Sequence, residues 1–336
     1  MKKLFSTIIC CLICSTAFMQ VKPEWQDETI PFVGKEYPRT AFMTYSDVNK
    51  ARSNDFNTST DYKSLNGKWK FNWVSSYKKR PVNFYKTDFD DSAWNEIEVP
   101  ANWEINGYGN ALYTNHPYEF CPRNPQPPLL PEENPVGSYR KYIEIPEQWN
   151  GKEIFLHIGA VKSGCYLYVN GTKVGYSEDS KDAVEYNITR YLKPGRNLIA
   201  LEVYRWSTGS YLECQDFWRI SGIERDVYLF AQLPLHLRDF SIRQDLDSTY
   251  KNGLFGLDLF MENTNPRQPG QVTVSYQLEN TSGTRVAEGT QTIKIDSATT
   301  VHFEAKIPQV APWTAETPNL YQLFIRIEQP GKTTEV

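Results

Sequence analysis

Histidine is scarce in this sequence, and the spacings that mark common catalytic and metal sites are missing. The four histidines lie far apart along the chain, so they form neither an H-E-x-x-H pair nor a zinc-ligand set. There is no G-x-S-x-G elbow and no phosphate-binding loop, and Gly107-Tyr108-Gly109 lacks the third glycine of a dinucleotide-binding motif. The sequence therefore gives no sign of a metallohydrolase, a serine hydrolase or a nucleotide-binding enzyme.

A surplus of positive charge is also absent, because 36 Lys and Arg face 40 Asp and Glu. Nucleic-acid binding is therefore not expected, since no basic surplus is available to displace counterions. The one long apolar run, residues 4–14, is too short to span a membrane, so no membrane association is predicted. It follows Met1-Lys2-Lys3 and precedes the small residues Ser15-Thr16-Ala17, which is typical of a signal peptide over residues 1–20. We expect an exported protein, periplasmic or extracellular.

Cysteine is sparse outside this leader. The mature chain keeps Cys121, Cys165 and Cys214, an odd number at wide spacing. This spacing excludes a disulfide framework and leaves a single disulfide open.

Sustained helical periodicity is missing, and β structure takes its place. The 9 Trp, 21 Tyr and 17 Phe residues suit a pleated, half-buried surface. Alternation predicts a first group of strands at Tyr139–Ile145, Glu153–Ile158, Tyr166–Val169, Leu198–Tyr204 and Val227–Phe230. Asn170-Gly171 predicts a two-residue hairpin turn.

Six more strand-like segments follow Pro234. They are Asp239–Asp245, Leu254–Met261, Gln271–Leu278, Gln291–Ile295, Val301–Ile307 and Leu320–Glu328. Their spacing is typical of an immunoglobulin-like sandwich that lacks its last strand. The loop from Cys121 to Pro135 instead holds six prolines. A long loop without alternation can be a stiff linker, but we favour a functional loop or arm.

Five ordered stretches carry a family resemblance. They are Leu65–Phe71, Val99–Glu104 with Gly107-Tyr108, Leu112–His116, Glu133–Arg140 and Arg205–Val227. Together they resemble the β-galactosidases of glycoside hydrolase family 2 over essentially the whole mature chain. The resemblance implies an all-β chain, with an arm over residues 21–54, a jelly-roll-like galactose-binding β-sandwich over 55–232 and an immunoglobulin-like β-sandwich over 233–336.

In this family a (β/α)₈ barrel follows these two domains and carries both catalytic glutamates. Nothing in the chain reads as such a barrel, which needs about 250 residues. No catalytic residue can therefore be named in this sequence, and the chain alone is expected to be inactive. The partners implied are β-galactoside sugars and the missing barrel, and homo-oligomerisation stays open.

By the same resemblance, Asn115 and Asp216 would contact the galactosyl ring, and Asp216 would also help to hold a sodium ion. The chemistry fits, because a carboxylate accepts hydrogen bonds from vicinal hydroxyls while an amide both donates and accepts. The structural alternatives are an Asp216 ion pair with Arg205 or Arg219, and a turn-capping role for Asn115.

The other polar and aromatic residues of this stretch receive weaker roles. Glu213 is a candidate for binding sugar hydroxyls. Trp206, Tyr211 and Trp218 could stack on a sugar face, but we favour core positions for them. Some relatives bind magnesium where this chain has Thr208 and Glu178; the residue types differ here, so no metal is predicted at that place. No cofactor is required by this portion, although sodium and magnesium could bind to the full enzyme.

The function predicted is the N-terminal portion of an enzyme that hydrolyses terminal β-D-galactosides with retention, in which these domains shape one wall of the active site. Two alternatives stay open. One is a free-standing, non-catalytic carbohydrate-binding module. The other is a different specificity within the family, β-glucuronidase or β-mannosidase.

Overall fold

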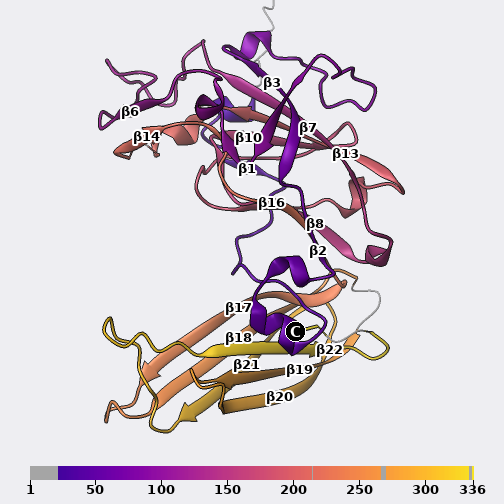
Figure 1. Cartoon of the computed structure of the whole chain (residues 1–336), viewed down its shortest axis with the longest axis vertical. Coiled ribbons are helices and arrows are strands. Elements are labelled where there is room, and N and C mark those ends of the chain that lie inside the picture. Colours follow the sequence, from indigo (N-terminus) through magenta and orange to yellow (C-terminus); the bar gives the residue numbers. More distant parts are fainter. Residues whose placement is uncertain (1–21, 214, 266–269, 333–334) are drawn as a thin grey trace, which may run out of the picture.

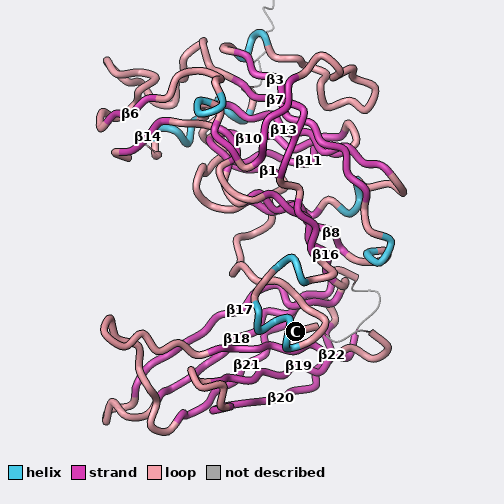
Figure 2. The backbone as a smooth tube through the Cα atoms, viewed as in Figure 1, coloured by secondary structure: helices cyan, strands magenta, loops and turns pink. Residues whose placement is uncertain are grey.

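The computed structural model describes residues 22–213, 215–265, 270–332 and 335–336. The predicted signal peptide, residues 1–20, and Cys214 lie outside these ranges. Strands dominate the described residues, and the helices among them are no longer than six residues (Figure 2). The helices are α1 (Val48–Ser53) and the 3₁₀ turns η1 (Glu24–Gln26), η2 (Phe56–Thr58), η3 (Tyr77–Lys79), η4 (Glu104–Asn106), η5 (Glu147–Trp149), η6 (Thr189–Tyr191) and η7 (Thr208–Tyr211). None of the described helices is long and apolar enough to cross a membrane.

The first sandwich is built from a seven-stranded and a four-stranded antiparallel sheet (Figure 1). In spatial order, the larger sheet holds β1 (Phe32–Val33), β11 (Thr172–Ser177), β10 (Gly164–Val169), β13 (Arg196–Tyr204), β7 (Val136–Glu144), β3 (Gly67–Val74) and β4 (Asn95–Val99). The smaller sheet holds β12 (Val184–Asn187), β8 (Glu153–Ile158), β16 (Val227–Gln232) and β2 (Tyr62–Ser64). One apolar core lies between them, and it draws Trp69, Leu167 and Leu201 from the larger sheet and Leu156 and Leu229 from the smaller. Burial of these alternating residues from water is what holds the two sheets together.

Two small sheets extend this sandwich. The first contains β5 (Ala101–Asn102), β15 (Gly222–Ile223) and β9 (Val161–Lys162). The second is a ribbon of two strands, β6 (Leu112–Thr114) and β14 (Phe217–Arg219), which projects from one end of the domain (Figure 1).

The second sandwich contains two three-stranded sheets. One holds β17 (Leu235–Leu246), β18 (Gly253–Asn263) and β21 (Ala298–Ile307), and the other holds β20 (Arg285–Ile295), β19 (Gly270–Glu279) and β22 (Gln322–Glu328). Leu257, Leu259, Val272, Val274 and Phe303 meet in the core between them. Among the described residues of this sandwich there are six strands, and the outer edge of β22 carries a single bridge, from Ile327 to Glu335.

The strand predictions agree closely with the structure. Every segment predicted from alternation overlaps a strand, from β7 and β8 through to β22. Asn170 and Gly171 form the tight turn between β10 and β11, with positive φ angles of 50° and 88°. The all-β prediction is therefore confirmed, because local alternation and turn chemistry point to the same ladders.

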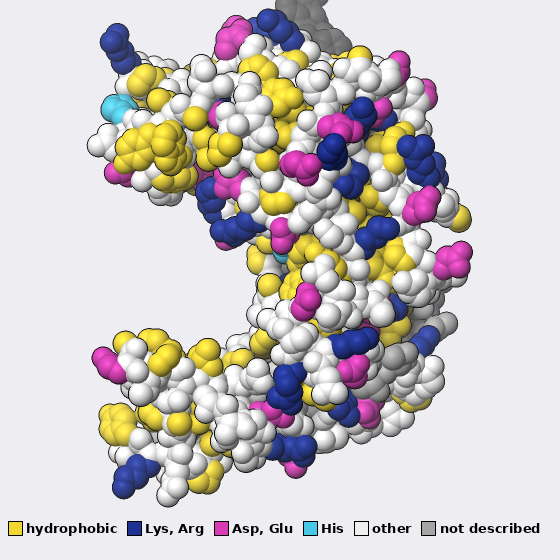
Figure 3. Space-filling view, viewed as in Figure 1, with side chains coloured by type: hydrophobic (Ala, Val, Ile, Leu, Met, Phe, Trp, Pro, Cys, Tyr) yellow, Lys and Arg dark blue, Asp and Glu magenta, His cyan; other side chains and the backbone are white. Residues whose placement is uncertain are grey.

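The segment from residue 22 to 54, called here the N-terminal arm, supplies β1 to the larger sheet of the first sandwich and contacts both domains. Met43 and Tyr45 pack with Phe155, Tyr228 and Phe230 of the first sandwich. On the other side, Thr40 donates its N–H to Asp239 at 2.9 Å and Arg52 pairs with Glu279 of the second sandwich. The molecule has the shape of a C, and the two sandwiches form its two ends around an open hollow (Figure 3).

Candidate functional site

The projecting ribbon brings Asn115 and Asp216 together. Its strands are antiparallel, with Phe217 opposite Thr114, Trp218 opposite Tyr113 and Arg219 opposite Leu112. Asn115 follows Thr114 and Asp216 precedes Phe217, so both residues continue from the same strand pair at the open end of the ribbon. Both side chains are exposed. Residues a hundred positions apart in sequence therefore share one small surface.

Alternation along the two strands sorts the ribbon into two faces. Tyr113 and Trp218 are cross-strand partners on the outer face, and their rings meet edge to face with centroids 5.8 Å apart. Asp216 belongs to that face as well, because Tyr113 donates its hydroxyl to Asp216 Oδ1 at 2.8 Å. This hydrogen bond to the carboxylate raises the pKa of the Tyr113 hydroxyl. Apolar side chains gather on the surface of the first sandwich in the region of β6 and β14 (Figure 3).

The predicted alternative for Asp216, an ion pair with Arg205 or Arg219, is not what the structure contains. Arg205 pairs with the buried Glu104 at 2.8 Å, and Arg219 Nε lies 3.8 Å from Glu119 Oε2. The acceptor that Asp216 offers is used by Tyr113 instead. For Asn115, the turn-capping alternative is also not observed, since the Thr114 hydroxyl accepts the backbone N–H of His116 at 2.9 Å.

A buried ion pair anchors the base of the ribbon. Glu104 Oε1 accepts from Arg205 at 2.8 Å, and Glu104 Oε2 accepts the backbone N–H of Ser221 at 2.8 Å. Arg205 also donates to the backbone carbonyl of Arg219, the last residue of β14, at 3.1 Å. Burial raises the pKa of Glu104 despite these hydrogen bonds and the nearby arginine. The pair therefore ties β14 to η4 of the sandwich below it.

The inner face of the ribbon lies among cations. The charged groups of Lys162, Lys181 and Arg219 are 5.4–5.6 Å from the centre of the Phe217 ring. Burial lowers the pKa of Lys162. This face packs onto the sandwich, so the outer face is the one open to a ligand.

Glu213, the other sugar-binding candidate, is already engaged. Its carboxylate accepts both the backbone N–H of Ser180, at 2.7 Å, and the Ser180 hydroxyl, at 2.5 Å. Glu213 therefore fixes a neighbouring loop, and the structure does not place it with Asp216 on the ribbon's outer face.

The three aromatic candidates divide into two kinds. Tyr211 is buried against Phe120, which precedes the proline-rich loop, and donates its hydroxyl to the backbone carbonyl of Leu129 within that loop. Trp206 packs on Phe120 as well and donates its ring N–H to Glu119 at 3.0 Å. Tyr211 follows the predicted core role, whereas Trp206 is only partly buried. Trp218 does not, because 55% of its surface is exposed.

Glu178 and Thr208 form a hydrogen-bonded pair in the interior. Thr208 donates to both carboxylate oxygens of Glu178, at 2.9 and 3.1 Å, and Tyr176 and the backbone N–H of Gly209 donate as well. Burial raises the pKa of this carboxyl group despite those donors. Because both oxygens accept from protein groups, this arrangement does not fit a magnesium ion, and the absence of a metal there stays a prediction.

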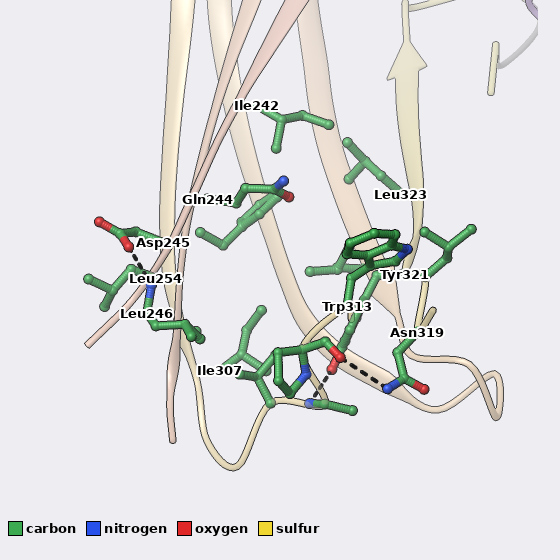
Figure 4. Close-up of a pocket in the computed structure, with 17 residues that line it drawn as sticks. Ile242, Gln244, Asp245, Leu246, Leu254, Ile307, Trp313, Asn319, Tyr321 and Leu323 are labelled. Carbon is green, nitrogen blue, oxygen red and sulfur yellow. Dashed lines mark hydrogen bonds between the residues drawn. The ribbon is translucent and has the colours of Figure 1, made fainter. Parts of the chain in front are cut away.

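Two further observations bound the site. Within the described ranges, no three His, Cys, Asp or Glu side chains group as metal ligands. The second sandwich has an apolar pocket of about 590 Å³ that is lined by Trp313 and Leu323 among others (Figure 4). Its one carboxylate, Asp245, accepts the N–H of Leu246. Of its other polar lining groups, the Tyr321 hydroxyl accepts the N–H of Ala311 and the Asn319 amide donates to the carbonyl of Pro312, so few are left to bind a sugar.

Sequence reasoning missed Tyr113 as a member of the site. Tyr113 lies two residues before Asn115 in a predicted sugar-contacting stretch, so strand alternation alone would have placed both on one face. The cross-strand partner, Trp218, depends on a pairing that only the structure supplies.

The fold and the ribbon together define a tandem β-sandwich protein that presents aromatic, amide and carboxylate side chains at the edge of a hollow. Residues 62–234 match the family model described as "Glycosyl hydrolases family 2, sugar binding domain", and residues 235–336 match the model "Glycosyl hydrolases family 2". The chain therefore belongs to glycosyl hydrolase family 2.

Known proteins agree with this assignment. The chain is 36% identical to a β-galactosidase of Priestia megaterium over 311 residues, which cover 91% of the chain and 30% of that protein. It is 38% identical to a β-galactosidase of Halalkalibacterium halodurans over 276 residues, 81% of the chain and 27% of that protein. A crystal structure of a Bacteroides uniformis β-glucuronidase shares the fold, with a TM-score of 0.66 at 23% identity over 82% of this chain and 31% of that one. The chain thus spans less than a third of the length of these relatives.

Proposed function

We propose that this chain is the N-terminal portion of a β-galactosidase that hydrolyses terminal β-D-galactosides with retention, and that its ribbon forms one wall of the active site. The observation that carries the proposal is the register of β6 and β14, which sets Asn115 and Asp216 at the same exposed end. The identities of 36–38% to β-galactosidases support this substrate class. The fold likeness to a β-glucuronidase, at 23% identity, does not distinguish between sugars.

In this proposal the ribbon binds and orients, and bond cleavage belongs to the glutamates of a (β/α)₈ barrel. Asp216 accepts hydrogen bonds from vicinal hydroxyls, and the Tyr113 hydroxyl holds its carboxylate in place. The Asn115 amide donates to and accepts from hydroxyls of the same galactosyl ring. Asp216 would also supply an oxygen ligand to a sodium ion, since hard cations prefer oxygen donors. One carboxylate does not complete such a site, so the other ligands would come from outside the ribbon.

The test begins with the DNA that follows codon 336. A reading frame that continues into a barrel with two glutamates would allow the whole enzyme to be expressed and assayed on nitrophenyl β-galactoside, β-glucuronide and β-mannoside. We expect the galactoside to be preferred. Asp216→Ala should lower kcat/KM about 10- to 100-fold, as expected for loss of hydrogen bonds to a charged group. Asp245→Ala, which removes an exposed carboxylate from the second sandwich, is the matched control.

A preference for the uronide or the mannoside would contradict the substrate class. The free-standing module is a different outcome. It predicts that the 336-residue chain binds galactosides at millimolar affinity or tighter, as measured by calorimetry, and that no barrel follows. Turnover of the chromogenic galactoside by the chain alone would contradict the expectation that it is inactive.

A further inference from the structure

The outer face of the ribbon carries two exposed aromatic side chains in addition to the polar Asn115 and Asp216. Tyr113 is 56% exposed and Trp218 is 55% exposed. Large exposed aromatics next to each other are costly to leave in water and commonly mark binding surfaces. Here they stand as a cross-strand pair directly beside Asp216.

The spacing along the strand relates these rings to the polar end of the ribbon. Asp216 and Trp218 are two residues apart in an extended chain and point to the same side, about 7 Å apart. A ligand held by Asp216 at the tip therefore reaches Trp218 only if it continues by roughly one more ring. In this arrangement a single galactosyl unit occupies the polar end of the ribbon. The group attached to that unit then lies over the pair formed by Tyr113 and Trp218.

We propose that Trp218, supported edge-on by Tyr113, is a stacking platform for the second ring of a β-galactoside, the sugar on the leaving-group side. This inference rests on the proposed function, because it takes Asp216 as the galactosyl contact. The flat C–H face of a pyranose ring is apolar, and its burial against an indole removes apolar surface from water on both sides. The platform would therefore favour glycosides whose leaving group is itself a sugar or an aromatic ring.

The hydrogen bond from Tyr113 links the two parts of this surface. Its ring supports Trp218 while its hydroxyl orients Asp216. Tyr113→Phe keeps the ring and removes the hydroxyl, so it should weaken binding of the galactosyl unit and leave the stacking contact in place. Trp218→Ala removes the stacking surface and leaves the Tyr113–Asp216 hydrogen bond intact.

The experiment uses the 336-residue chain and two probes, lactose and methyl β-D-galactoside, in saturation-transfer NMR titrations. Wild type should transfer saturation to both rings of lactose, with a Kd weaker than the millimolar affinity that a free-standing module would show, because the chain supplies only one wall of the pocket. Trp218→Ala should remove the transfer to the glucose ring and raise the Kd for lactose roughly three- to ten-fold, the factor that loss of an aromatic contact produces. Trp218→Phe should restore part of this affinity. Trp313→Ala, which removes an indole that is 61% exposed on the second sandwich, should bind lactose like wild type.

Each outcome separates this inference from the proposed function. If Trp218→Ala and Trp313→Ala bind lactose equally, or if wild type transfers no saturation to the glucose ring of lactose, the platform is overturned and Trp218 serves as a contact for another protein surface. If Asp216→Ala leaves binding of methyl β-D-galactoside unchanged, the proposed galactosyl site fails instead. Far-UV circular dichroism of each variant checks folding, which should be unaffected because Trp218 is exposed.

Discussion

Arg39 of the N-terminal arm should contribute more to the free energy of unfolding than an exposed arginine does. Its guanidinium donates to both oxygens of Glu185, at 2.8 and 3.1 Å, and it also stacks on Phe42 and Phe230 at 4.7 Å. The side chains of Arg39 and Glu185 are only 5% and 11% exposed. Replacing Arg39 by Ala therefore leaves a carboxylate buried with His157 as its remaining partner.

The magnitude can be estimated from the pKa of Glu185. Burial alone would raise this pKa, but the hydrogen bond from His157 and the charge and hydrogen bonds of Arg39 outweigh it and lower the pKa from 4.5 to about 2. A fall of this size corresponds to about 3 kcal/mol of stability, to which His157 and Arg39 both contribute. Breaking a buried ion pair by removing one partner costs about 3–5 kcal/mol, which agrees.

The sign of the pH dependence follows from the direction of the shift. Because the folded pKa lies below the unfolded value, this stability is fully present above pH 4.5 and is lost as the pH falls towards 2. Arg39→Ala should flatten that acid dependence as well as lower stability at neutral pH. Arg39→Lys keeps the charge but not the paired hydrogen bonds, so it should fall in between.

Urea unfolding followed by circular dichroism, at neutral pH and again midway through the acid window, measures both effects. Arg285→Ala is the matched control, since the Arg285–Glu288 pair is 53% and 63% exposed and should contribute less than about 1 kcal/mol. An Arg39→Ala variant that loses no more stability than Arg285→Ala would refute the reasoning. So would an acid dependence equal to that of wild type.

Three further predictions concern the interior of the first sandwich. Gly137→Ala should lower its unfolding free energy by about 1–3 kcal/mol in urea titrations, because the new methyl group would sit 2.5 Å from Trp103 and 2.8 Å from Phe71. Thr208→Val should cost about 2 kcal/mol by the same assay, since it removes a donor to the buried Glu178, whereas Thr249→Val at an exposed turn should change little. Cys165 should resist thiol reagents in the native state, because it is a free, buried thiol whose pKa is raised by burial; Cys165→Ser should therefore leave the native thiol count unchanged.

The ladders of both sandwiches could be predicted from the sequence because strand signals are local. The alternation in β19 and the Asn170-Gly171 turn are each read within a dozen residues, and the structure follows them. The arm could not be assigned a role in the same way. Its packing of Met43 on Tyr228 depends on a contact across nearly two hundred residues, and no local pattern encodes such a contact.

The exposure of Trp218 is likewise a feature of the site that no local sequence pattern predicts. A tryptophan in a β protein is expected in the core, and Trp206 and Tyr211 of the same stretch do pack against Phe120. Trp218 differs because, among the strands that the structure describes, β14 pairs only with β6, in a ribbon whose outer face no other described sheet covers. Which face of a strand is covered is a property of the tertiary structure, so the sequence alone could not distinguish these aromatics.

An isolated two-stranded ribbon is marginally stable in water, so the position of Asp216 must be secured from below. The buried Arg205–Glu104 pair does this through the backbone of Arg219 and Ser221, on the C-terminal side of β14. Glu104 itself belongs to η4, and Arg205 also donates to the backbone carbonyl of Asn110, two residues before β6, at 3.5 Å. One ion pair therefore holds the bases of both strands, and the geometry of the exposed end is set by groups that no ligand touches. Weakening this pair should disorder Asn115 and Asp216 together, because neither strand of the ribbon has another sheet partner in the part of the chain that the structure describes.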